Sequence, residues 1–442
     1  MLEYAFLVRY DYCKQLCITY FSLTNYHKES GDTMSSSYWL TNVCLEKGYR
    51  YEHGAIIGTI TENCHLFVEN GKIANIISAD TLLDDHLPKK DVHNLLALPS
   101  FVEKHVHLDK TLLGDKWRAV TPVSSIFERF ELEKNVLPTL PTTTKERAQA
   151  LIEVLLQAGS THIRTHVDIY QEAGLKNFFE VQEALAEYEG KLSYEIVAFP
   201  QHGLLLNNCA DLVRDAVRNG AGLVGGVDPA NVDGNMEKSL QQMMDIAVEE
   251  NVGIDLHLHD PGQLGLATIR RLAKLTEEAG WHGRVAISHA FALGDMGKGE
   301  ADEMAQMLAE LGISIITSVP IGRTIPPVSF LHDKGVQVAV ACDNIFDSWS
   351  PFGNGDILER ASTLAQLSGR STEQKLAETL GFITGGITPL NKNGKQVWPK
   401  IGDEASIVFT EASCSAEAIS RRSNRPAVLY KGKLVAGGFT KG

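Results

Sequence analysis

The sequence predicts an α/β fold: a (β/α)8 TIM barrel with a small β-sandwich domain built from both chain ends. Its length of 442 residues allows one large barrel with an appendage. Short β-branched runs alternate with helical stretches through the middle of the chain, whereas both ends have the composition of strands and turns. Polar residues also gather at the ends of the predicted strands, which is where barrel enzymes have their active sites.

The first 33 residues are expected to be an N-terminal extension that the fold does not need. Residues 1–33 are apolar and aromatic, but Arg9, Asp11 and Lys14 interrupt them. A secretory signal needs about 7–15 continuous apolar residues and a small-residue cleavage site, so this stretch does not fit one. Met34 opens a more ordinary segment.

Both ends of the remaining chain indicate strands. Residues 34–97 and 390–442 hold short strand-and-turn patterns, and we expect them to pair into the small β-sandwich domain. The Asn-Gly pair at 70–71 and the Lys-Gly pair at 431–432 indicate hairpins.

The intervening residues 98–389 predict the barrel. Helical stretches with apolar residues at i, i+3 and i+4 separate the predicted strands. A doubly wound sheet is the alternative, because periodicity alone does not distinguish the two folds. The eight predicted strands lie within 97–107, 161–168, 193–200, 221–228, 252–260, 283–290, 312–319 and 335–343.

Composition excludes several classes of function. The chain has 41 Lys and Arg against 55 Asp and Glu, a net charge of −14 that disfavours binding to nucleic acid. It has no uninterrupted run of about 18 apolar residues that would span a membrane. The seven cysteines are scattered without a C-x-x-C pair, which favours a reducing compartment, so we expect a soluble, cytoplasmic protein.

Four residues at strand ends predict a metal site. His105 and His107 lie two positions apart, which on a strand places both imidazoles on the same face. His257 lies at the end of the fifth strand. Asp343 follows an apolar run on a strand expected to be buried on both faces, where a carboxylate needs a cation or a donor. Taken singly, the histidines fit ordinary core residues and Asp343 fits a helix cap. Together they favour a divalent ion, zinc or iron.

The predicted metal site holds one ion. Binuclear hydrolases of this architecture often bridge their ions with a lysine on the third or fourth strand, but no lysine lies between Lys191 and Lys238. In a mononuclear site the ion lowers the pKa of bound water from about 15.7 towards 7 and supplies hydroxide as the nucleophile.

Several motifs between residues 96 and 390 resemble the amidohydrolase superfamily, and within it the cytosine deaminase-like branch. They are FVEKHVHLDKT at the first strand, IRTHVDI at the second, IVAFPQHGLL at the third, DLHLHD at the fifth, ISHA at the sixth and CDNIFDSWSPFGNGDILERA at the eighth. The last of these is the most specific. The resemblance implies a metal-dependent barrel enzyme, and oligomerisation is common among relatives, so we expect a homo-oligomer.

The resemblance also implies roles for individual residues. The metal ligands would be His105, His107, His257 and Asp343. Asp260 would be the general acid/base, His289 would orient the hydroxide and shuttle its proton, and Gln201 would read the substrate ring. Trp349 would line the pocket, with a loop aromatic packed on the barrel rim as the alternative.

The chain departs from the branch at several positions. Asp260 stands where the family has glutamate, which shortens the side chain by one methylene, and Asn344 stands where cytosine deaminases have a second aspartate. Lys110 resembles the branch that removes alkylamines from triazine rings, although a salt bridge with Asp109 or Asp115 would also explain it. These departures make cytosine itself a weaker candidate than other heterocycles.

The expected reaction is hydrolytic removal of ammonia or a small amine from an amino-substituted nitrogen heterocycle, such as a pyrimidine, triazine or purine, by metal-bound hydroxide. A cyclic-amide or lactam hydrolase using the same ion is the alternative. A non-catalytic barrel is a third hypothesis, which the presence of all four candidate ligands disfavours. Residues 114–135, after the first strand, are expected to form a lid.

Overall fold

The structure is a computed structural model that describes residues 37–439. The predicted N-terminal extension, residues 1–33, lies outside the described residues. In the described part no helix is both long enough and apolar enough to cross a membrane.

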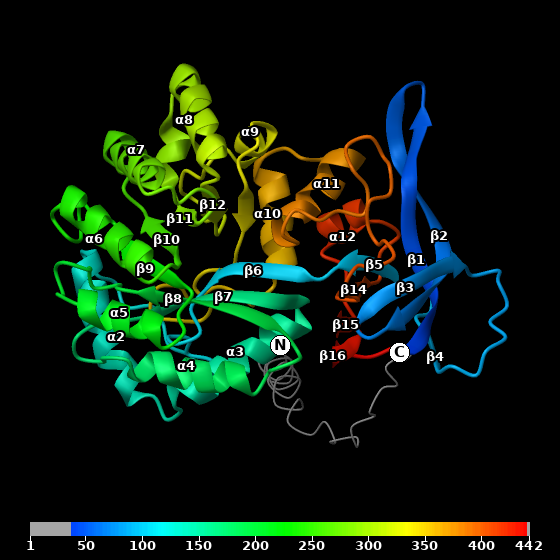
Figure 1. Ribbon diagram of the computed structural model, residues 1–442, viewed down its shortest axis with the longest axis horizontal. Helices are drawn as coiled ribbons and strands as arrows, with labels where there is room; N and C mark the ends of the chain where they lie inside the picture. Colours follow the sequence, from blue (N-terminus) through cyan, green and yellow to red (C-terminus); the bar gives the residue numbers. More distant parts are fainter. Residues whose placement is uncertain (1–36, 440–442) are drawn as a thin grey trace, which may run out of the picture. The chain divides into compact units, whose positions relative to one another are not determined.

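Eight parallel strands form the barrel, and their spatial order is their order in the chain (Figure 1). The last strand meets the first through a parallel bridge between Asp343 and Val106, where the Asp343 N–H donates to the His105 carbonyl at 2.7 Å. A doubly wound sheet would reverse its strand order at a switch point, so the barrel is confirmed. The strands are β6 (Phe101–Val106), β7 (Ser160–Asp168), β8 (Ser193–Phe199), β9 (Leu223–Val227), β10 (Gly253–Leu258), β11 (Val285–His289), β12 (Ser314–Thr317) and β13 (Val338–Val340).

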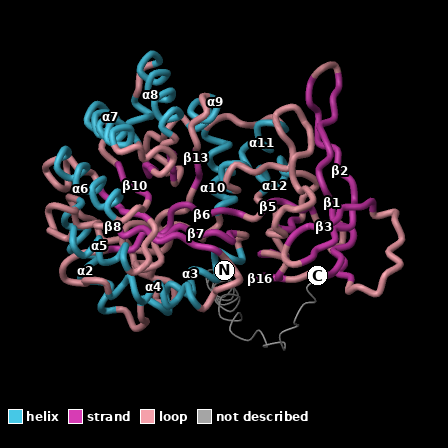
Figure 2. Tube along the Cα trace, in the orientation of Figure 1, coloured by secondary structure: helices cyan, strands magenta, loops and turns pink. Residues whose placement is uncertain are grey.

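Helices follow the strands and surround the barrel (Figure 2). The helix over Thr144–Gln157 begins with a capping box. The Thr143 hydroxyl accepts from the Glu146 N–H, and the Glu146 carboxylate accepts from the Thr143 N–H. Between β6 and β7 lie α2 (Ile126–Val136), η2 (Leu137–Thr139) and α3 (Thr144–Gln157). The later ones are α4 (Lys176–Ala186), α5 (Ala210–Arg218), α6 (Met236–Glu249), α7 (Gly262–Glu278), η3 (Phe291–Asp295), α8 (Lys298–Leu311), α9 (Val328–Asp333), α10 (Ile357–Leu367), α11 (Glu373–Thr379), η4 (Leu380–Ile383) and α12 (Ser415–Arg421).

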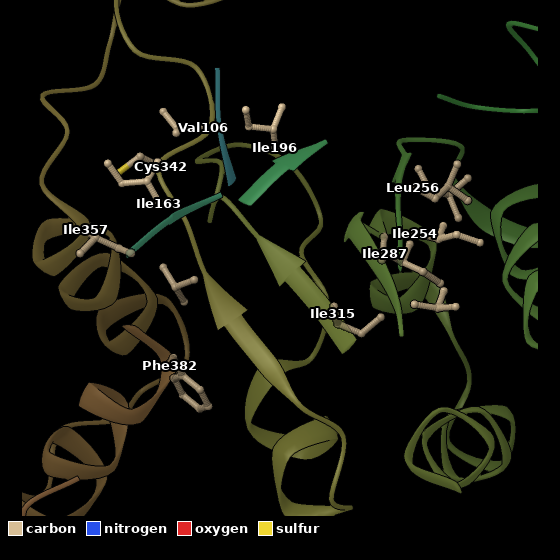
Figure 3. Close-up of a cluster of buried hydrophobic side chains, with 14 of the residues drawn as sticks. Val106, Ile163, Ile196, Ile254, Leu256, Ile287, Ile315, Cys342, Ile357 and Phe382 are labelled. Atoms are coloured by element: carbon tan, nitrogen blue, oxygen red, sulfur yellow. The ribbon is translucent and has the colours of Figure 1, made fainter. Parts of the chain in front are cut away.

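Strand periodicity separates the apolar core from the barrel interior. On β10, Ile254 and Leu256 belong to the large core cluster, part of which Figure 3 shows. Asp255 and His257 alternate with them and so point to the other face. Asp255 bonds Arg164 of β7, which is not a neighbouring strand, so this contact crosses the barrel interior. The same alternation carries His257 to the interior at the carboxyl end of the strand.

Strands from both chain ends form a second sheet, as predicted. Its two predicted hairpins are confirmed at 70–71 and 431–432. Gly71 and Gly432 both have positive φ, and their turns pack together so closely that a Cβ on Gly71 would lie 2.9 Å from the Lys431 carbonyl oxygen. The strands are β1 (Ser37–Glu52), β2 (Ala55–Glu69), β3 (Lys72–Ser78), β4 (Lys89–Asp91), β5 (Leu96–Pro99), β14 (Ile407–Thr410), β15 (Ala427–Tyr430) and β16 (Lys433–Gly437).

Candidate active site

A cluster of imidazoles and one carboxylate lies at the carboxyl ends of the barrel strands. The four predicted ligands belong to it. Asp343 Oδ1 lies 3.5 Å from His105 Nε2 and 3.4 Å from His107 Nε2, so the H-x-H pair converges on the carboxylate from the last strand. The His257 ring centroid lies 4.5 Å from that of His105. The structure therefore brings together four residues that are far apart in the chain.

The hydrogen bonds of His105 leave one ring nitrogen ready for a metal. Its Nδ1 lies 2.8 Å from Ser288 Oγ, and that hydroxyl donates its proton to Asp255 Oδ1 at 2.7 Å. The Ser288 oxygen must therefore accept from His105 Nδ1–H, which leaves the Nε2 lone pair free. Such outer partners commonly orient metal-binding histidines.

Several buried ring nitrogens of the cluster lack a hydrogen-bond partner within the described residues. Among the described residues, His105 Nε2, His107 Nδ1 and both ring nitrogens of His257 are buried without a hydrogen bond. Burial and the neighbouring imidazoles hold the pKa of His257 well below its usual value, so the ring is neutral and able to ligate. Three imidazoles and one carboxylate are a suitable donor set for zinc or iron. The residues present thus fit a divalent ion.

His166 also belongs to the cluster, although no role was predicted for it. One ring nitrogen each of His105, His166 and His257 lie within 4.8 Å of one another. Both nitrogens of His166 are buried without a partner in the described part of the chain. The feature of the sequence that could have indicated a role for His166 is its position near the end of β7, two residues before Asp168.

His259 and His289 form the open face of the cluster. Both line a cavity of about 1210 Å³ at the barrel mouth, together with Asp343. Their rings stack at a centroid distance of 4.3 Å. Asp228 holds His259 in place, because its carboxylate accepts from the His259 N–H at 2.6 Å and lies 2.8 Å from His259 Nδ1. Burial alone would lower the pKa of His259, but Asp228 outweighs it and raises that pKa.

Asp260 is buried and is not among the residues that line the cavity. Its Oδ1 accepts a hydrogen bond of 2.6 Å from Asn231 Nδ2, whereas its Oδ2 is buried without a partner among the described residues. Burial, and secondarily the charge of Asp228, raise its pKa, which favours the protonated acid. The acid/base role of Asp260 stays a prediction.

The four candidate substrate-binding residues fall into two environments. Asn344 and Trp349 line the cavity. Lys110 and Gln201 are almost fully buried, with 1% and 3% of their surface exposed, and they bond to each other.

Lys110 and Gln201 lie in a buried network with Glu133 of α2. Lys110 Nζ donates to Asp168 Oδ1 at 3.1 Å, which replaces the salt bridge expected with Asp109 or Asp115. Gln201 Nε2 donates to Glu133 Oε1 at 2.6 Å. Both polar atoms of the Gln201 amide are thus bonded within the protein.

The segment predicted as a lid carries α2, which contacts both the third-strand and eighth-strand loops. Phe130 stacks on His202 with ring centroids 4.9 Å apart. Arg129 Nη1 donates to the Ser348 carbonyl at 2.6 Å, and Glu133 Oε2 accepts from Trp349 Nε1 at 2.6 Å. This helix therefore closes the side of the site where Gln201 lies.

Comparison with known proteins identifies this arrangement. The model of the Amidohydrolase family matches residues 175–436, a span that includes His257, His289 and Asp343. The chain belongs to the amidohydrolase family. The predicted resemblance to the amidohydrolase superfamily is thereby confirmed.

This amidohydrolase has relatives that match most of its length. It is 42% identical to the uncharacterized protein YahJ of Escherichia coli (strain K12), over 92% of this chain and 90% of that protein. It is 32% identical to N-isopropylammelide isopropyl amidohydrolase of Pseudomonas sp. (strain ADP), over 78% of this chain and 87% of that protein. The crystal structure of N-isopropylammelide isopropylaminohydrolase from Burkholderia multivorans ATCC 17616 superposes with a TM-score of 0.80 at 29% identity, covering 92% of this chain and 99% of that one.

Proposed function

We propose that this amidohydrolase hydrolytically removes ammonia or a small amine from an amino-substituted nitrogen heterocycle. The observation that carries the proposal is the convergence of His105, His107, His257 and Asp343 beside a cavity into which His289 also opens. The similarity to a protein named for N-isopropylammelide supports a heterocyclic substrate that carries an amine.

The four converging residues would hold one divalent ion, zinc or iron. When bound, such an ion lowers the pKa of a water ligand towards neutrality and so supplies the nucleophile. The lack of a lysine between Lys191 and Lys238 supports a mononuclear site. His289, whose Nδ1 lies 4.0 Å from Asp343 Oδ2, would take up the proton that the attacking water loses.

Asp260 is the proposed proton donor to the ring nitrogen of the substrate. Its raised pKa keeps it protonated to higher pH than an exposed aspartate, and its Oδ2 has no competing partner in the described chain. Protonation of the ring nitrogen and attack at the neighbouring carbon would give a tetrahedral intermediate. The proton held by His289 would then pass to the amine, which leaves, while the hydroxyl proton of the intermediate would return to Asp260. On the enzyme, Asn344 and Trp349 would border the bound ring.

Ammonia or amine release tests the proposal. The full chain, purified without chelators and loaded with zinc or iron, is assayed against aminopyrimidines, aminotriazines with and without N-alkyl groups, and aminopurines. Release of ammonia or alkylamine with an unchanged ring supports the proposal. A new carboxylate without ammonia would instead identify a cyclic-amide hydrolase. Binding of heterocycles without any turnover would indicate a non-catalytic barrel.

A further inference from the structure

Three arginines line the cavity without an acidic partner. Arg129, Arg323 and Arg360 all contribute to its wall. Within residues 37–439, none of the three guanidinium groups lies within 4.0 Å of a carboxylate oxygen. Some arginines elsewhere are paired with carboxylates, such as Arg164 with Asp255 at 2.9 Å. In a chain with a net charge of −14, unpaired arginines gathered in one cavity require an explanation.

Arg323 lies beside Phe291, and the ring of Phe291 lies next to His259 and His289 at the open face of the cluster. Its guanidinium carbon is 5.7 Å from the Phe291 ring centroid. That centroid is in turn 5.7 Å from His289 and 5.8 Å from His259. If the amino-bearing carbon of a substrate ring faces His289, the opposite edge of that ring would lie along Phe291 and face Arg323.

Arg129 supplies a guanidinium group that is already held in place. Its side chain is buried, with 9% of its surface exposed, and one of its five N–H groups is used by the Ser348 carbonyl. Such an immobilised, desolvated guanidinium loses little entropy when it binds a carboxylate, and it offers paired donors.

The carboxylates near the cavity do not cancel this positive charge. Glu359 also lines the wall, but it already accepts from Asn354 Nδ2 at 3.0 Å and lies 3.8 Å from Arg422. The acidic groups around Lys110, which are Asp109, Asp168 and Glu133, are buried and act on that ammonium group. The Lys110 ammonium group lies 3.1 Å from Asp168 Oδ1 and so offsets part of their negative charge.

We propose that the substrate of this enzyme is an amino-heterocycle that carries a carboxylate on the edge remote from its amino group, bound by Arg323 and Arg129 with Arg360 adding positive charge. This inference rests on the proposed function and narrows its substrate class. A guanidinium group recognises a carboxylate through two parallel hydrogen bonds, so a neutral substituent of the same shape would be bound much less tightly.

Matched pairs of compounds test the inference. Each pair is an amino-substituted pyrimidine, triazine or purine carboxylate and its carboxamide, which has the same shape without the charge. We expect the carboxylate to have a kcat/KM about 10-fold to 100-fold above that of its carboxamide in the wild-type enzyme. Arg323→Ala and Arg129→Ala should each remove most of this preference by raising KM for the carboxylate.

Arg421→Ala is the matched control, because Arg421 is an exposed arginine on α12 that does not line the cavity. It should leave the preference unchanged. Arg323→Lys, which keeps the charge, should retain part of it. Equal kcat/KM for both members of every pair, or a preference that survives in Arg323→Ala and Arg129→Ala, would overturn the inference.

A binding measurement separates this inference from the proposed reaction. Pyrimidine carboxylates that lack an amino group cannot release ammonia, so calorimetric titration with them tests the anion site without turnover. If no amino-heterocycle is hydrolysed but these carboxylates bind the wild type more tightly than Arg323→Ala, the proposed reaction fails and the anion site stands. Equal binding of carboxylates and carboxamides would overturn the anion site even in an active enzyme.

Discussion

Trp349 Nε1 donates a hydrogen bond of 2.6 Å to Glu133 Oε2. The other oxygen of the same carboxylate accepts from Gln201 Nε2, also at 2.6 Å. Glu133 therefore ties together two candidate substrate-binding residues that come from the loops of the third and eighth strands. Because α2 carries Glu133, the position of this helix sets the wall of the substrate cavity.

Glu133→Gln should weaken substrate binding more than catalysis. The glutamine amide has one acceptor oxygen for two donors, so either Gln201 or Trp349 would face an N–H group and turn away. We expect KM to rise by about 10-fold with a smaller change in kcat. Glu131→Gln, on the exposed side of the same helix, is the control and should be neutral. Unchanged KM in Glu133→Gln would show that this carboxylate does not position the cavity wall.

Asp260→Asn should separate proton transfer from metal binding. The amide is nearly isosteric but cannot donate an acidic proton, so we expect kcat to fall by about 10²-fold to 10⁴-fold. Because Asp260 is not a ligand, the metal content should equal that of the wild type. Full activity in Asp260→Asn would refute the assignment and direct attention to His259, which faces the cavity.

Lys110→Met should destabilise the protein. Asp109, Asp168 and Glu133 surround the buried ammonium group and, against the effect of burial, raise its pKa. Removing the cation leaves buried carboxylates uncompensated, at a cost of about 3–5 kcal/mol in the free energy of unfolding, measured with urea. Lys145→Met, at a partly exposed ion pair with Glu187, should cost less than about 1 kcal/mol. Loss of activity at unchanged stability would instead make Lys110 a substrate contact.

Glu46 should make stability depend on pH. Burial raises the pKa of this carboxyl from 4.5 to about 7, although Ser415 donates to it. The folded state then holds the proton after the unfolded state has lost it, so stability falls as pH rises from about 4.5 to 7. The contribution is about 3 kcal/mol at about 1.4 kcal/mol for each pH unit. Urea unfolding at pH 5 and 7.5 should show a smaller fall in Glu46→Gln than in the wild type, and equal falls would contradict this account.

The barrel could be predicted from the sequence because each of its strands is recognised from a short, continuous stretch of residues. Each strand is a short β-branched run, and the polar residues at or just after its end, such as His257 and Asp343, mark the carboxyl ends that a barrel brings together. The hairpins at 70–71 and 431–432 were equally local, since glycine is needed where φ is positive.

The contacts that shape the site could not be predicted, because they depend on how loops fold back. Nothing in the residues around Glu133 indicates that one carboxylate on α2 would bind both Gln201 and Trp349. Likewise, the H-x-H spacing of 257 and 259 did not reveal that Asp228 would hold His259 at the open face of the cluster. Such side-chain contacts join segments distant in the chain and leave no periodic pattern.

The metal content of the wild type and of His257→Ala tests the central claim most directly. Elemental mass spectrometry measures the metal per chain in protein purified without chelators, both as isolated and after reconstitution with zinc or iron. His93→Ala, at a partly exposed histidine in the turn between β4 and β5, serves as the control. We predict about one zinc or iron per chain in the wild type and in His93→Ala, and a large loss in His257→Ala. Two ions per wild-type chain, no ion even after reconstitution, or full occupancy in His257→Ala would contradict the mononuclear site.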